Sequence, residues 1–274
     1  MKKSWVAYPY VVWMIMFIVV PLMLIIFYGT FERTPQGIEF TLEHFKRFFE
    51  PLYVMVLIRS LYLALICTIV CLLLGYPVSM ILASKEYRDK RILIFLMVIP
   101  MWMNFLLRTY AWLTLLEKNG IINTFISFLG LPKMELLYNQ WAVVLGMVYN
   151  FLPFMVLPIY SVLIKIDKSI IEAAEDLGAN SRIVFSKIIF PLSLPGVVSG
   201  ITMVYMPAVT TFVISRLLGG GQFLLIGNLI EELFLKSGEW GFGSALSIIM
   251  MILILFSMAI MSKYEKENEG GGLL

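Results

Sequence analysis

The search for reactive side chains begins with two cysteines and a single histidine. Cys67 and Cys71 are four residues apart in an apolar stretch, so a helix places both on one face. A metal site would need a second pair of ligands, and His44 lies in a different segment. The pattern predicts thiols that face lipid or the protein core, with no metal site.

Polar residues inside or beside long apolar stretches form a second group of candidates. Such groups are costly in a membrane and commonly mark the route of a transported solute. Arg108 follows Asn104 by one helical turn, and Pro100 before them can open the helix. The candidate translocation pathway consists of Asn104, Arg108, Tyr149, Asn150, Tyr205, Thr211, Arg216 and Glu231.

Each pathway candidate also has a purely structural interpretation. Arg108 can extend to the membrane surface or pair with carbonyl groups, and the other polar residues can join neighbouring helices. The charged candidates favour solutes of opposite charge. Arg108 and Arg216 favour an anionic solute, whereas Glu231 and Glu232 favour a cation.

A third group lies in the segment 164–196, which is long and polar. Asp167 and Ser169 can cap the start of a helix there, and Gly178 can end it. A second short helix, about 181–190, then leads into the next apolar stretch. An acidic helix containing alanines offers a knob for a groove on another protein. A helix lying on the membrane surface would be richer in lysine and arginine.

The elements that position these residues are membrane spans. Of the 274 residues, 60% are hydrophobic and 14% charged, and the mean hydropathy is +0.90. Soluble domains are about half apolar and about a quarter charged. Since a span needs roughly 20 apolar residues, we expect an all-α polytopic protein with six transmembrane helices near 8–29, 58–84, 92–116, 140–163, 193–216 and 242–262.

The distribution of basic residues predicts the orientation. With cytoplasmic termini, the inner segments hold twelve lysines and arginines and the outer segments six. Cytoplasmic segments carry the excess of positive charge, so both termini are expected in the cytoplasm. Among the outer segments, 41–53 is expected to form a surface helix with Phe45, Phe48 and Phe49 on one side. Residues 121–131 are expected to form an interfacial or re-entrant helix.

The acidic segment matches a family pattern. Importer permeases carry Glu-Ala-Ala, three residues, Gly, nine residues, Ile, one residue and Leu-Pro. Here the match is Glu172-Ala173-Ala174, Gly178, Ile188 and Phe190-Pro191, with phenylalanine in place of leucine. The chain resembles permease subunits of ABC-type, binding-protein-dependent importers along nearly its whole length.

This resemblance implies the type I importer permease fold and a bacterial plasma membrane location. It also implies four kinds of partner: a pair of cytoplasmic ATPase subunits, a second permease subunit, an extracytoplasmic solute-binding protein and membrane lipid. No partnership with nucleic acid is expected. By resemblance, an element that couples to the ATPase contains Glu172, Ala173, Ala174, Asp176, Leu177 and Gly178.

ATP chemistry is expected in another chain. The sequence has no G-x-x-x-x-G-K-[ST] phosphate loop, and Gly219-Gly220-Gly221 lacks the lysine. The permease itself is therefore expected to bind no cofactor and to be no enzyme. An intramembrane enzyme is further disfavoured because no acidic residue lies in any predicted span. A channel or scaffold would have no use for the coupling segment.

The solute is suggested by resemblance alone. Four runs are similar to the first permease subunit of spermidine/putrescine importers, among them VIPMWMNFLLRTYAW and LLGGGQFLLIGNLI. Parts of them also resemble permeases for iron, thiamine, sulfate or molybdate, which stay as alternatives. The chain is expected to form one transmembrane permease domain, 1–266, with the coupling loop at about 164–192 and a flexible tail, 267–274.

Overall fold

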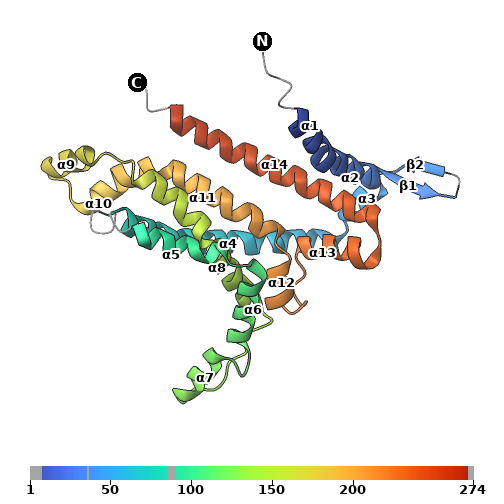
Figure 1. Ribbon diagram of the computed structural model, residues 1–274, viewed down its shortest axis with the longest axis horizontal. Coiled ribbons are helices and arrows are strands. Elements are labelled where there is room, and N and C mark those ends of the chain that lie inside the picture. Colours follow the sequence, from blue (N-terminus) through green and yellow to red (C-terminus); the bar gives the residue numbers. More distant parts are fainter. Residues whose placement is uncertain (1–7, 36, 85–90, 271–274) are drawn as a thin grey trace, which may run out of the picture.

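Long apolar segments satisfy their backbone in lipid by forming helices, and helices dominate this chain. The computed structural model, shown in Figure 1, describes residues 8–35, 37–84 and 91–270. Within these residues, five helices are long and apolar enough to cross a membrane, or six if one bent pair of helices is counted as a single span. Lys2, Lys3, Lys85, Arg88 and Lys90, which contribute to the predicted orientation, lie outside the described residues.

Three helices form the core: α4 (Pro51–Ala83), α8 (Gln140–Leu163) and α11 (Phe190–Thr210), each packed on the other two. Small residues bring the three helices close together. This is expected in a membrane, because an apolar side chain gains little free energy when it leaves lipid for the contact between two helices. A Cβ atom at Gly196 of α11 would lie only 2.9 Å from the carbonyl oxygen of Pro158. The hydroxyl of Ser79 in α4 donates to the carbonyl of Val156 in α8 at 3.0 Å.

The first span lies outside this core. It comprises α1 (Tyr8–Met14), a π-helical turn (Ile15–Val19) and α2 (Val20–Thr30). Among its described residues only Gly29 is buried, and α2 packs mainly along α14 (Trp240–Gly270), as Figure 1 shows. Much of its surface is therefore left to lipid or to another subunit.

A hairpin and a short helix follow at the end of the first span. Strands β1 (Phe31–Thr34) and β2 (Gly37–Phe40) pair antiparallel and project from the bundle (Figure 1). In α3 (Glu43–Phe48), Phe48 is buried whereas Phe49 is 75% exposed. The predicted apolar side containing both phenylalanines is therefore wrong, because α3 ends before Phe49.

Arg47 ties α3 to α4 and α14, a cluster that the sequence did not reveal. Its guanidinium forms an ion pair with Glu239, donates to the Tyr53 hydroxyl at 3.0 Å and lies 4.3 Å from the ring centre of Phe242. Burial lowers the pKa of Arg47, but hydrogen bonds to Glu239 and Tyr53 outweigh that effect and raise it. The arginine therefore stays charged and fixes one end of the bundle.

The predicted third span, 92–116, is wrong as a single helix. It consists of α5 (Arg91–Trp102) and α6 (Phe105–Leu116). The helical segments Ile92–Trp102 and Phe105–Phe128 meet at 92°. The break falls at Asn104, whose side-chain oxygen accepts a hydrogen bond from the backbone N–H of Leu106 at 2.8 Å. Asn104 thus caps a new helix, which turns away from the bundle (Figure 1).

Helix α7 (Ile121–Phe128) continues this arm. The side chain of Asn123 is buried and holds the following loop, because it donates to the carbonyl of Met134 at 2.9 Å and accepts from the same residue's N–H at 2.8 Å. Phe125 and Phe128 are exposed. An interfacial position for this helix stays a prediction.

The predicted fifth span, 193–216, is shifted at both ends. The helix begins with α10 (Ser181–Val184), passes through a π-helical turn (Phe185–Ile189) and ends with α11 at Thr210. Beyond it lie α12 (Val213–Leu218), α13 (Ile226–Glu232) and a π-helical turn, Leu233–Ser237. Among the other predicted spans, 58–84 begins earlier, at Pro51, while 8–29 and 140–163 agree within one residue.

The last helix, α14, extends past the predicted span 242–262 to Gly270. The first residues of the predicted tail are therefore helical, and residues 271–274 lie outside the described part of the chain.

Candidate coupling helix and translocation pathway

The acidic segment folds as an isolated, exposed helix at one end of the bundle. Helix α9 (Lys168–Asp176) begins at Asp167, whose carboxylate accepts a hydrogen bond from the backbone N–H of Ser169 at 3.0 Å. Hydrogen bonds from the Ser169 backbone and hydroxyl lower the pKa of Asp167 below its usual range. The carboxylate therefore remains charged at the positive end of the helix, where it is most favourable.

The other end of α9 presents an apolar knob. Gly178 takes a left-handed conformation with φ of +84°, which terminates the helix. Just before it, the side chain of Leu177 is 90% exposed. Glu172, Ala173 and Asp176 are exposed as well, and Ala174 is half-buried. The six predicted coupling residues thus lie together on one projecting helix and its end.

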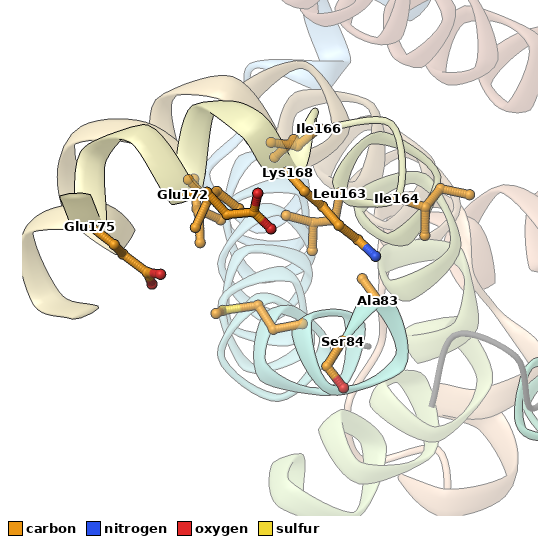
Figure 2. Close-up of a pocket in the computed structure, with 11 residues that line it drawn as sticks. Ala83, Ser84, Leu163, Ile164, Ile166, Lys168, Glu172 and Glu175 are labelled. Atoms are coloured by element: carbon orange, nitrogen blue, oxygen red, sulfur yellow. The ribbon is translucent and has the colours of Figure 1, made fainter. Parts of the chain in front are cut away.

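A cavity of about 350 Å³ separates α9 from the ends of α4 and α8. Figure 2 shows that the Lys168 and Glu172 side chains extend from α9 toward the space beside Ala83 and Ser84. Because this space is open, few packed side chains hold α9 against the membrane helices. At its start α9 is joined to α8 through residues 164–167, and at its end to α10 through Gly178.

The turn after Gly178 is itself capped, so ordered backbone joins α9 to the fifth span. Asn180 accepts a hydrogen bond from the backbone N–H of Ile183 at 3.0 Å and starts α10. From Ser181 the helix continues unbroken to Thr210. The predicted second short helix, about 181–190, is therefore the beginning of the fifth span, and Pro191 and Pro195 are accommodated within it.

Among the pathway candidates, the structure brings Arg216 and Glu231 into direct contact. Arg216 Nη1 donates a hydrogen bond to Glu231 Oε1 at 2.7 Å. The second nitrogen, Nη2, lies 2.7 Å from Glu231 Oε2, and this contact is an ion pair without hydrogen-bond geometry. Beneath this pair, the buried Asn228 side chain hydrogen-bonds the Ser215 hydroxyl and donates to the Phe212 carbonyl at 2.7 Å. Helices α12 and α13 are thus joined by two adjacent polar contacts.

Arg108 and Asn150 are buried with incomplete hydrogen bonding. Arg108 is 8% exposed, and its Nε and Nη1 atoms have no hydrogen-bond partner within the described part of the chain. Asn150 donates to the carbonyl of Gly146 at 2.8 Å, but its Oδ1 atom is unpaired there. Buried polar atoms of this kind call for an acceptor or donor supplied by a solute, water or another subunit.

The remaining candidates are dispersed. Asn104 caps α6, and the Tyr149 ring contacts that of Trp112, joining α8 to α6. Tyr205 is half-buried in α11, and Thr211 is buried where α11 ends. The eight residues therefore do not form one cluster. Their parent helices do adjoin, since α6 packs on both α8 and α12.

The thiols agree with the sequence interpretation. Cys67 and Cys71 are free and fully buried in the core. Among the described residues, no three histidine, cysteine, aspartate or glutamate side chains lie where together they could hold a metal ion.

Comparison with known proteins agrees with this architecture. Spermidine/putrescine transport system permease protein PotB of Escherichia coli K12 is 40% identical over 247 residues, which cover 88% of this chain and 90% of that protein. PotB of Haemophilus influenzae is 38% identical over 252 residues, covering 89% of this chain and 88% of that protein. The similarity thus extends over nearly the full length.

A solved structure shares the fold. A bacterial ABC transporter involved in the import of alginate superposes with a TM-score of 0.73, covering 96% of each chain at 18% identity. Residues 1–267 match the family described as "Binding-protein-dependent transport system inner membrane component". With several apolar helices and this match, the chain is a multi-pass membrane protein and belongs to that family of ABC importer permease subunits.

Proposed function

We propose that this permease imports polyamines of the spermidine and putrescine type, with α9 transmitting the movement of a separate ATPase. The observation that carries the coupling role is the exposed end of α9, where Leu177 projects beside the left-handed Gly178. An exposed leucine on a fixed helix end is suited to a groove on a partner protein. Supporting the solute assignment, relatives of 38–40% identity carry the spermidine/putrescine name.

The charge arrangement accommodates a cationic solute. The Arg216 charge is neutralised by Glu231, and Arg108 lies buried. Glu231 itself has a 16% exposed side chain and lines a cavity of about 320 Å³. Sulfate and molybdate remain the alternatives to be excluded, together with iron and thiamine.

The proposed complex has a pair of cytoplasmic ATPases, a second permease subunit packed beside this chain, and an extracytoplasmic binding protein that delivers the solute. ATP-driven closure of the ATPases would displace α9. The continuous helix from Ser181 to Thr210 then carries that displacement toward α12 and α13. In this arrangement α9 and both termini face the cytoplasm.

Uptake of labelled spermidine tests the solute. In a bacterium without other polyamine importers, deletion of this permease is expected to abolish uptake and the intact gene to restore it. Excess unlabelled putrescine should compete, whereas sulfate, molybdate, thiamine and iron should not. Unchanged uptake in the deletion strain would refute the polyamine assignment. Loss of uptake of another solute would identify the alternative.

Labelling with a membrane-impermeant maleimide tests the orientation. We expect Lys165→Cys, just before α9, to react only after the cells are permeabilised. Phe49→Cys, at the opposite end of α4, is the matched control and should react in intact cells. Cys67 and Cys71 are fully buried, so background labelling should be low. Reaction at position 165 in intact cells would exclude contact between α9 and a cytoplasmic ATPase.

A further inference from the structure

The Arg216–Glu231 pair joins two cavities. Glu231 lines a cavity of about 320 Å³ whose other walls are largely apolar, including Phe212, Ile230 and Met250. Arg216 lines a second cavity of about 180 Å³. A carboxylate in apolar surroundings needs a positive partner, because an unpaired buried charge is strongly unfavourable. In this structure the partner is the protein's own arginine.

The two members of the pair are held very differently. The side chain of Glu231 is 16% exposed, whereas that of Arg216 is 45% exposed. The guanidinium can therefore exchange its contact with the carboxylate for water at small cost, as exposed ion pairs commonly do. The Glu231 carboxylate cannot exchange its partner for water in the same way, because its side chain is largely enclosed by the protein.

The polar contact beneath the pair keeps the carboxylate in place when the arginine leaves. Ser215 and Asn228 are 1% and 6% exposed, and their hydrogen bond joins α12 to α13 independently of Arg216. Gly227 adds a backbone contact, since a Cβ atom there would lie 2.5 Å from the Thr210 carbonyl oxygen. The position of Glu231 thus does not depend on its ion pair.

We propose that Glu231 binds an ammonium group of the transported solute and that Arg216 is its exchangeable counterion. The inference rests on the proposed polyamine function and deepens it. A linear polyamine combines ammonium groups with methylene segments, which suits a carboxylate beside Phe212, Ile230 and Met250. Between transport events Arg216 occupies the carboxylate, so Glu231 is never left unpaired in apolar surroundings.

Reconstituted complexes containing the partner subunits and spermidine-loaded binding protein test this exchange. The quantity measured is spermidine taken up per ATP hydrolysed. Glu231→Gln is expected to lower it by at least about tenfold, because the solute loses its charged partner. Arg216→Gln is expected to leave it within about threefold of the unmodified complex, since the carboxylate remains. The double variant should resemble Glu231→Gln.

Glu232→Gln is the matched control. Glu232 neighbours Glu231, but it pairs with Lys236 at 3.2 Å and is 39% exposed. The Glu232→Gln complex should take up as much spermidine per ATP as the unmodified complex. ATPase binding of all variants should match that of the unmodified complex, and a lower thermal midpoint is expected only for Arg216→Gln, which leaves the Glu231 carboxylate without its counterion.

The asymmetry between the two single variants separates exchange from a structural role. If the ion pair only fastened α12 to α13, Arg216→Gln and Glu231→Gln would be equally harmful, and that result would overturn the proposal. Uptake per ATP that is equal in all forms would overturn the exchange while leaving polyamine transport intact. A complex that retains its ATPase but carries no spermidine in any form would overturn both.

Discussion

Replacing Leu177 with serine is expected to weaken binding of the purified cognate ATPase by about 10- to 100-fold. The side chain is 90% exposed in the free permease and would be enclosed on docking. Burying a leucine contributes about 1.5–3 kcal/mol, and about 1.4 kcal/mol corresponds to tenfold in affinity. Because Leu177 packs against little in this chain, the thermal midpoint of the isolated permease should not change. Titration of the detergent-purified permease with labelled ATPase measures the effect.

Leu235→Ser provides the matched control. Leu235 is 77% exposed and lies after α13, away from α9, so its replacement should leave ATPase affinity unchanged. Equal affinity of the Leu177→Ser variant and the unmodified chain would contradict the docking role of α9.

Gly178 offers a second variant of the same experiment. A side chain at this position would meet no atom within 4 Å, but φ is +84°. Asparagine and aspartate tolerate this conformation better than other residues do. Gly178→Asp adds a negative charge at the docking end and should weaken ATPase binding. Gly178→Asn has nearly the same shape without the charge and should bind more tightly than Gly178→Asp.

The sequence predicted the coupling segment well because its structure depends on local chemistry. Asp167 caps α9, and Gly178 ends it, through contacts within a few residues. The first and fourth spans were also predictable, since uninterrupted apolar length determines a helix in lipid. These elements required no knowledge of tertiary packing.

The third span was wrongly predicted as one helix because a polar residue within it serves the backbone. Asn104 caps α6 at a sharp bend, while its place in a translocation pathway stays a prediction. An asparagine in an apolar stretch is compatible with both roles, and a neighbouring Pro100 does not decide between them. The end of the fifth span at Thr210 was missed for a different reason, because most of the residues that follow it are apolar.

Contacts between residues far apart in the chain could not be predicted from the sequence. Arg216 and Glu231 were both selected, yet as evidence for opposite solute charges. Their contact depends on the turn between α12 and α13, which brings together residues fifteen positions apart. Arg47 was not selected at all, because its partner Glu239 is separated from it by 192 positions.

Arg108→Met is expected to stabilise the isolated permease while impairing the complete transporter. In the described part of the chain, two nitrogens of the buried Arg108 guanidinium have no hydrogen-bond partner. An uncompensated buried charge destabilises a protein by about 3–5 kcal/mol, and an apolar side chain of similar volume removes that cost. In domains of this size, each kcal/mol raises the thermal midpoint by roughly 2–4 °C. The midpoint of the purified chain measures this effect.

Arg216→Met supplies the control with the opposite sign. Removal of the Arg216 guanidinium leaves the enclosed Glu231 carboxylate without a counterion, so the thermal midpoint of the isolated chain should fall or stay constant. A lower midpoint for Arg108→Met would show that Arg108 already has its partners within this chain. A higher midpoint together with lost spermidine uptake would place the missing hydrogen-bond acceptor outside this chain. In that case Arg108 lowers the stability of the isolated subunit and finds its partner only in the assembled or solute-loaded transporter.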